Sequence, residues 1–225
     1  MSLKEILYRI LIQGGSYNVI LKGLYATIRI SLFSLVIGTL LGAFICMLRT
    51  SKLKLLNIPA KIYILILRGS PVLMLLMLMY YGVFARSSLE AETIAVITFS
   101  LNVAAHVAEL LRASISATDY GQVEAARTLG FSRFQAFRLV TMPQIIRIAK
   151  PVYQSTIINL IQWTSVVGYV SITDLTRVVN NIASRTMQPM ITIIIGMMIY
   201  LGLAYIVHGV FAVSDYFQHR RENIS

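Results

Sequence analysis

The sequence predicts an all-α membrane protein, because it is too apolar for a water-exposed surface and its apolar residues form long runs. Hydrophobic residues make up 57% of the 225 positions, charged residues make up 13%, and the mean hydropathy is +0.74. Soluble domains are about 45–50% apolar and about 25% charged. In lipid, only helices and closed barrels satisfy the backbone hydrogen bonds, and the alternating segments that a barrel needs are absent from the sequence.

About five transmembrane helices are expected, since a span takes about 20 apolar residues. The apolar runs cover residues 30–48, 69–85, 93–108, 151–173 and 186–214. Ahead of the first run, Ile6, Leu7, Ile10 and Leu11 recur at helical spacing, which predicts an N-terminal interfacial helix rather than a cleaved signal peptide. In the second run, Ser70 as an N-cap and Pro71 in a first helical turn predict a broken helix.

The basic residues indicate which ends of the runs face the cytoplasm. With the N-terminus outside and the C-terminus inside, 12 Lys and Arg residues lie in inner segments and 6 in outer segments. Inner loops carry the excess of basic residues in membrane proteins, so the net charge of +11 favours this orientation. A nucleic-acid surface, the other reading of a basic chain, is not expected because the hydropathy places these residues beside a membrane.

The stretch between the third and fourth runs predicts a compact helical loop. Asp119 and Ser132 are candidate N-caps, each followed three residues later by glutamine, and Gly130 between them is a helix stop. Thr141 begins a third such pattern, with Pro143 in the first turn of the next helix. A plain solvated basic loop is the alternative; we interpret the loop, residues 113–143 of a single 1–225 membrane domain, as a platform for a cytoplasmic partner.

Polar side chains form two stripes within the third and fourth runs. Because such groups are costly in hydrocarbon, they are expected to face the protein interior or water. The candidate substrate-pathway residues are Thr98, Asn102, His106 and Glu109 in the third run, and Ser155, Asn159, Gln162 and Ser165 in the fourth. Hydrogen bonding between helices, or an ion pair of Glu109 with Arg112, is the structural alternative.

The loop also carries an identifying motif. Its residues resemble the EAA loop of bacterial binding-protein-dependent importer permeases, with Glu124-Ala125-Ala126, Gly130 and Met142-Pro143. Other elements are similar to the polar amino-acid branch of that family: Arg68-Gly69-Ser70-Pro71, Ala108-Glu109 with Arg112, and Thr164-Ser165. Two departures leave the substrate open: the segment from Asn102 to His106, where that branch more often has small residues and a tyrosine before Ala-Glu, and Gln162-Trp163 before Thr164, where Lys-Asp is more usual.

The resemblance implies the transmembrane permease subunit of an ATP-driven importer of amino acids, polar or basic ones in particular. It implies a bacterial cytoplasmic (inner) membrane location, a second permease subunit (a copy or a paralogue), two ATP-binding subunits and an extracytoplasmic substrate-binding protein. ATP and magnesium then belong to the ATPase, and this chain holds no cofactor. The residues implied in coupling to the ATPase are Gly121, Glu124, Ala125, Ala126, Gly130 and Pro143.

The sequence contains no Gly-x4-Gly-Lys-Ser/Thr phosphate loop and no catalytic cluster, so the chain itself is not expected to be an enzyme. Cys46 lies alone in an apolar run, and no metal site is expected. Two other functions stay open. An ion-gradient-driven secondary transporter would usually show an internal repeat, which is not evident. A non-transporting membrane scaffold would not need two polar stripes.

Overall fold

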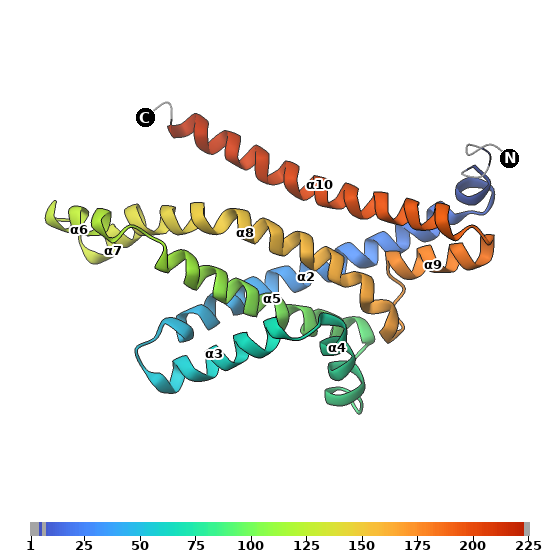
Figure 1. Ribbon diagram of the computed structural model, residues 1–225, viewed down its shortest axis with the longest axis horizontal. Helices are drawn as coiled ribbons and strands as arrows, with labels where there is room; N and C mark the ends of the chain where they lie inside the picture. Colours follow the sequence, from blue (N-terminus) through green and yellow to red (C-terminus); the bar gives the residue numbers. More distant parts are fainter. Residues whose placement is uncertain (1–4, 6–7, 223–225) are drawn as a thin grey trace. The chain divides into compact units, whose positions relative to one another are not determined.

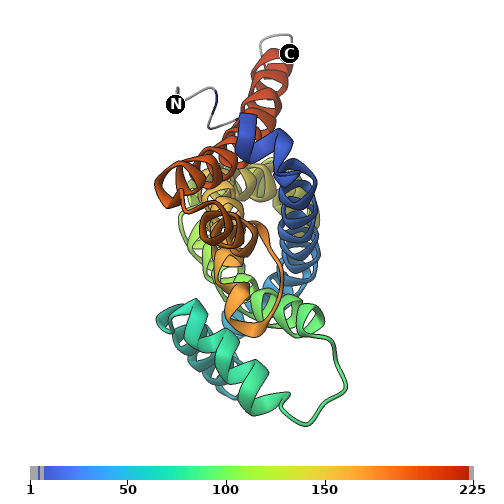
Figure 2. The same ribbon diagram turned by 90° about the vertical axis from the view of Figure 1, so that its right-hand side faces the viewer.

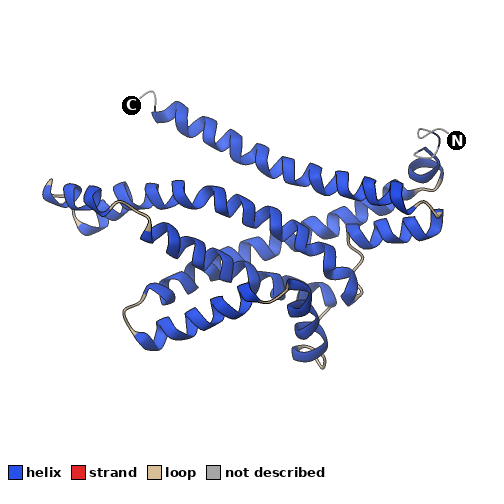
Figure 3. Ribbon diagram, in the orientation of Figure 1, coloured by secondary structure: helices blue, strands red, loops and turns tan. Residues whose placement is uncertain are grey.

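The computed structural model describes residue 5 and residues 8–222, and all regular structure in this part of the chain is helical (Figures 1 and 3). The long helices are α2 (Ser16–Thr50), α3 (Lys54–Gly69), α5 (Ala91–Ser116), α8 (Met142–Trp163) and α10 (Pro189–Glu222). The shorter ones are η1 (Arg9–Gln13), α4 (Val72–Met77), η2 (Leu78–Val83), α6 (Tyr120–Thr128), α7 (Arg133–Ala136), η3 (Phe137–Thr141), η4 (Thr164–Val170) and α9 (Leu175–Thr186).

Three of the described helices are long and apolar enough to cross a bilayer, namely α2, α5 and α10. The broken pair of α3 with α4 and η2 makes a fourth if it forms one span. The expected run 151–173 is divided between α8 and η4, and α8 is not among the helices that are long and apolar enough to cross a bilayer. Helix α8 begins nine residues earlier than expected and so includes Arg147 and Lys150, and its second half carries Asn159 and Gln162.

The chain divides into two compact units that alternate along the sequence. Unit 1 comprises residues 1–35, 71–99 and 158–225, and unit 2 comprises residues 36–70 and 100–157. Three of the four boundaries fall inside α2, α5 and α8 and the fourth lies between α3 and α4, and neither unit is a continuous piece of chain. The single domain expected from the sequence stays a prediction.

Unit 1 is organised around α9, which packs against α10 (Figure 2). Its apolar residues Leu175, Val178, Val179 and Ile182 are buried together with Ile10 and Ile20. Two glycines permit this close packing, because a Cβ at Gly23 or Gly196 would lie 2.8 Å from a methyl group of Val178 or Val179. No helix was predicted here from the sequence. Two signals of a helix are nevertheless present, namely Asp174 as an N-cap and the 3.6-residue spacing of the apolar residues.

The N-terminal part of unit 1 differs from the expected interfacial helix. Residues 6 and 7 of that prediction lie outside the described residues, and η1 is a short π-helix that ends at Gln13, shortly before Gly15, where φ is +61°. Helix α2 then begins at Ser16 and includes Arg29, whose guanidinium forms an ion pair with Glu92 of α5. The pair neutralises a charge that the span would otherwise bury.

Unit 2 has a smaller apolar core in which Cys46, Ile64 and Ala108 are buried, as expected for an unpaired cysteine in an apolar run. The predicted break in the second run is confirmed, but Ser70 has a different role. Its hydroxyl donates to the Ile66 carbonyl at the end of α3 and does not cap α4, which starts after Pro71 without a side-chain cap.

Candidate functional site

The polar side chains of the α5 stripe mostly interact with other groups inside the protein. Thr98 is fully buried, and its hydroxyl donates to the Ile94 carbonyl of its own helix at 2.7 Å. Asn102, 1% exposed, donates from Nδ2 to the Leu67 carbonyl at 2.9 Å. Because α3 ends at Gly69, this carbonyl is one of the four that a helix C-terminus leaves without an intrahelical partner. Asn102 therefore completes the end of α3.

Asn102 also carries an unusual acceptor. Its Oδ1 is a buried side-chain atom with no hydrogen-bond partner in the described part of the chain. A buried polar atom without a partner costs about 1–3 kcal/mol, so native proteins keep few of them. This residue combines a structural hydrogen bond with an open acceptor on the same side chain.

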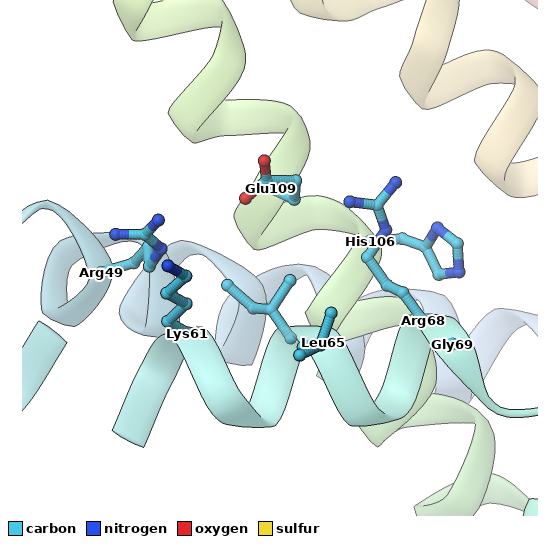
Figure 4. A pocket seen from close by; sticks show the side chains of 8 residues that line it. Arg49, Lys61, Leu65, Arg68, Gly69, His106 and Glu109 are labelled. Carbon is cyan, nitrogen blue, oxygen red and sulfur yellow. The ribbon is translucent and has the colours of Figure 1, made fainter. Parts of the chain in front are cut away.

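The other two residues of the α5 stripe, His106 and Glu109, line a pocket of about 360 Å3 within unit 2 (Figure 4). The Glu109 carboxylate accepts two hydrogen bonds from Arg112, at 2.9 Å from Nε and 2.6 Å from Nη2. The expected ion pair is therefore present. The remaining lining is Arg49, Lys61, Ile64, Leu65, Arg68 and Gly69, of which none was predicted as a site residue. Lys61 and Arg68, seven residues apart in an otherwise apolar helix, were the available signal.

The polar side chains of the α8 stripe are exposed, in contrast to those of α5. Ser155, Asn159 and Gln162 are all exposed, and their spacing places them on one face of the helix. Between them Thr156 and Leu160 are buried, so the helix turns its apolar side inward and its amides outward. This face is unsuited to lipid and is available to water or to another protein.

Ser165 lies beyond the end of α8 in a second pocket, of about 450 Å3, within unit 1. The other lining residues are Val166, Gly168, Tyr169, Thr176, Arg177 and Asn180. Arg177 is held there by a hydrogen bond from Nη1 to the Gly168 carbonyl, at 3.1 Å. The sequence analysis predicted only Ser165, because α9, which supplies Thr176, Arg177 and Asn180, was not anticipated.

Helix α9 begins at Asp174, which is fully buried and lies outside the spanning helices. Its carboxylate accepts hydrogen bonds from the backbone amides of Thr176 and Arg177, each at 3.0 Å. Burial raises the pKa of the Asp174 carboxyl above its ordinary value, because the charged form loses hydration, and these hydrogen bonds only partly oppose the shift.

The helical loop of unit 2 forms as expected, with changes in detail. Asp119 caps α6 by accepting from the Gly121 amide at 2.9 Å. The Asp119 amide donates to Gln144 Oε1 at 2.9 Å, in place of the expected Gln122, and Gln144 Nε2 donates to Gln122 Oε1 at 3.0 Å. Gln144 thus ties the two ends of the loop together. The second capping box, between Ser132 and Gln135, is confirmed.

The third expected helix start, at Thr141, is wrong, because α7, η3 and α8 follow one another without a break. Pro143 has no amide hydrogen for the carbonyl four residues earlier, and its ring crowds that carbonyl. The preceding π-turn accommodates it: the Met142 amide donates to the Phe137 carbonyl, five residues back. Pro143 therefore lies within a widened helix rather than at a new start.

The residues predicted to couple to an ATPase differ in their exposure. Gly121, Glu124, Ala125, Gly130 and Pro143 are exposed, whereas Ala126 is 6% exposed and packs within the loop. Gly130 has φ of +90°, a conformation that strains any residue with a Cβ, and nothing lies within 4 Å of the position that a Cβ would take.

Large apolar side chains are unusually exposed on this loop. The exposed fraction is 80% for Leu129, 70% for Phe134 and 64% for Tyr120, and Phe137 and Leu139 are exposed as well. Clustered apolar residues at a surface otherwise lined by charged groups mark an interaction site. The loop therefore presents a platform to a partner, held in shape by its own capping network.

Spanning helices, a polar helix face and an exposed helical platform define the chain as a membrane component of a multi-subunit transport system. It belongs to the family of binding-protein-dependent transport system inner membrane components, whose model matches residues 34–221. The family predicted from the EAA motif is thus confirmed.

Several characterised proteins are similar over most of the chain. The probable amino-acid ABC transporter permease protein YckA of Bacillus subtilis is 38% identical over 192 residues, covering 85% of each protein. The histidine/lysine/arginine/ornithine transport system permease protein HisM of Escherichia coli K12 is 29% identical, covering 88% of each. The crystal structure of an amino acid ABC transporter with histidines matches with a TM-score of 0.82 and 31% identity, over 94% of this chain and 98% of the other.

Proposed function

We propose that this chain is the membrane-spanning permease subunit of an ATP-driven importer of amino acids, with polar and basic ones as the first substrates to test. The relatives named as amino-acid permeases support the substrate class. The exposed face of α8 supports it further, because Ser155, Asn159 and Gln162 offer neutral donors and acceptors to a polar solute.

The observation that carries the proposal is the exposed helical loop from Tyr120 to Thr141. In the proposed complex it docks on an ATP-binding subunit, so hydrolysis takes place on that partner with its ATP and magnesium, and this chain needs no cofactor or metal. The complex contains two permease subunits, two ATP-binding subunits and an extracytoplasmic substrate-binding protein. The N-terminus lies outside the cytoplasmic membrane and the C-terminus inside, which brings the loop to the ATPase.

The coupling role is tested by two substitutions of different kinds. Ala125→Trp places a bulky group on the exposed side of α6, while Gly130→Val strains the turn that follows it. Both are expected to reduce co-purification of the ATPase and to abolish binding-protein-stimulated hydrolysis and uptake. The control is Ala85→Trp, at an exposed alanine outside the loop, where attachment should be unchanged.

Ala126→Trp separates the interface from the fold of the loop. Because Ala126 is buried, a tryptophan there should disrupt the loop itself and lower thermal stability, which Ala125→Trp should not. Normal attachment and normal stimulated hydrolysis in both Ala125→Trp and Gly130→Val would contradict the coupling role.

The orientation is tested by cysteine labelling in intact cells, on a Cys46→Ala background. Arg133→Cys in the loop is preferable to a change at Ser132, whose hydroxyl caps α7. Only membrane-permeant reagents should label position 133, whereas impermeant reagents should label Arg86→Cys, in an exposed outer segment. Labelling of position 133 by an impermeant reagent would reverse the proposed orientation.

The substrate is identified by adding single amino acids to the reconstituted complex with its binding protein. Hydrolysis stimulated by a polar or basic amino acid, together with its accumulation in vesicles, would support the proposal. Stimulation by none of them, with an intact ATPase, would refute the substrate class but leave the coupling result unaffected.

A further inference from the structure

The pocket between α2, α3 and α5 in unit 2 holds an excess of positive charge. Arg49, Lys61 and Arg68 line it, and Glu109 is its one carboxylate. That carboxylate already accepts two hydrogen bonds from a fourth cation, Arg112. The other acidic residues of unit 2, Asp119 and Glu124, belong to the helical loop and do not line the pocket.

The cations lie on two helices, α2 and α3, at the two ends of the pocket. Figure 4 shows Arg49 beside Lys61 at one end of the pocket and Arg68 beside His106 at the other, with Leu65 between them. Lys61, Leu65 and Arg68 share a face of α3 because they are four and three residues apart. Arg49 donates to Asn57 Oδ1 at 2.7 Å, which holds it at the pocket. Within the described part of the chain, neither Lys61 nor Arg68 donates a side-chain hydrogen bond.

Cations gathered around one pocket repel one another even where water reaches them, as it does at the exposed Lys61 and Arg68, and a bound anion relieves that repulsion. An anionic oxygen cluster, such as a phosphate, accepts hydrogen bonds from Arg and Lys together. A site of about 360 Å3 is large enough for a phosphate with part of its ester substituents.

The apolar residues around the pocket indicate which kind of anion it binds. Ile64 and Leu65 form part of the lining, and Leu65 continues onto an exposed apolar strip of α3 with Ile62 and Ile66, which are 71%, 51% and 55% exposed, respectively. A charged pocket that opens onto apolar helix surface suits an amphiphile, whose head takes the cations and whose chains follow the strip. In the proposed orientation the end of the pocket formed by Arg49 and Lys61, which lies nearer the connection between α2 and α3, faces the cytoplasmic leaflet, where anionic lipids are found.

We propose that the pocket lined by Arg49, Lys61, Arg68 and His106 binds the phosphate headgroup of an anionic phospholipid. Arg49 and Lys61 at one end of the pocket and Arg68 at the other supply charge-assisted hydrogen bonds to the headgroup, and Ile62, Leu65 and Ile66 contact the acyl chains. Glu109, paired with Arg112, leaves the three lining cations to the ligand.

The test measures lipids retained by the full chain, purified together with its partner subunits. The complex is exposed to equimolar phosphatidylglycerol and phosphatidylcholine, and the lipids that remain bound are counted by native mass spectrometry. Wild type should retain the anionic lipid preferentially. Lys61→Gln with Arg68→Gln should reduce that preference about 25-fold, since each basic residue near a lipid surface contributes about fivefold.

The matched control is Lys52→Gln with Lys54→Gln, which removes the same charge from exposed positions ahead of the pocket. It should keep the preference, as should Lys61→Arg. If the protein with Arg68→Gln does not fold, Lys61→Gln alone, on the exposed side of α3, should show an about fivefold reduction.

Three results would overturn the proposal. One is equal retention of the two lipids by wild type. Another is an equal loss in the control double variant, which would mean only diffuse attraction between lipid and basic surface. The third is displacement of phosphatidylglycerol by excess inorganic phosphate in wild type but not in the pocket variant, which would assign the pocket to a soluble anion.

Discussion

Helices α5 and α8 carry similar polar stripes in the sequence, yet the structure uses them in opposite ways. On α5, Thr98 and Asn102 are buried and hydrogen-bonded within the protein. On α8, Asn159 and Gln162 are exposed on one face of the helix. The comparison shows that a polar stripe in an apolar helix indicates only that this face avoids lipid; what it meets depends on the helices packed beside it.

The largest effect expected from this difference is on stability, at Asn102. Asn102→Leu removes the donor to the Leu67 carbonyl and leaves that acceptor in a buried setting without a partner. The free energy of unfolding should fall by about 1–2 kcal/mol, because the simultaneous loss of the unpartnered Oδ1 offsets part of the cost. Thermal denaturation in detergent measures it.

Thr98→Val is the matched control on the same stripe. Its hydroxyl bonds only to its own helix, and valine has nearly the same shape, so stability should change by less than about 0.5 kcal/mol. If both variants are equally stable to heat, Asn102 does not contribute to the end of α3, and the contrast between the two stripes disappears.

The second effect is on transport, at the exposed stripe of α8. Gln162→Leu should leave the melting temperature nearly unchanged, because the side chain is exposed, while uptake falls about tenfold through loss of a hydrogen-bonding group worth about 1.4 kcal/mol. Assembly is checked by co-purification of the complex. Val152→Leu, an exposed apolar position on the same helix, serves as the control.

Full uptake by Gln162→Leu and by Asn159→Leu, with normal assembly, would mean that the α8 stripe does not contact the substrate. A drop in assembly without a change in the uptake of each assembled complex would instead place the stripe among the hydrogen bonds between subunits. Either outcome would remove the proposed substrate contact from the α8 stripe.

The smallest effect is a pH dependence of stability that arises from the buried, hydrogen-bonded carboxyl group of Asp174. The pKa of Asp174 is raised in the folded state, so folding binds its proton more tightly than the unfolded chain does. Its contribution to stability is therefore greatest below its ordinary pKa of 3.8 and is lost as the pH rises through the raised value. Asp174→Asn should abolish this dependence of the melting temperature.

Asp174→Ala removes the cap as well and should be about 1 kcal/mol less stable than Asp174→Asn at all pH values. If the wild-type protein and Asp174→Asn lose stability in parallel between pH 4 and 7, the dependence arises from other groups, and burial of this carboxyl has no measurable cost.

Local features of the fold were predictable where one short stretch of sequence contains all the partners. The capping box of Ser132 with Gln135 and the turn at Gly130 depend on residues within five positions of each other, and both form as predicted. The break between two helices at Ser70 and Pro71 was predictable for the same reason. Family membership was predictable because the EAA motif lies in one loop.

Features that depend on distant residues were not predictable in this way. Gln122 has the right spacing to complete the cap at Asp119, but Gln144, which is brought there by the fold of the loop, reaches the same amide. The basic pocket combines Arg49, Lys61 and Arg68 with His106, residues that are up to 57 positions apart and belong to no single local motif. Likewise, Arg29 pairs with Glu92, which is 63 positions away in the sequence.

The sequence by itself determined that the chain is a helical membrane protein, that it has a compact helical loop between two of its apolar runs, and which family it belongs to. Composition, hydrophobic runs and short motifs carry that information, because the cost of burying polar groups in lipid acts on each segment separately. The tertiary structure alone decided which polar groups are buried, which cations share a pocket and where α9 packs. Those outcomes depend on contacts between segments, and the periodicity of one segment does not indicate which other segments pack against it.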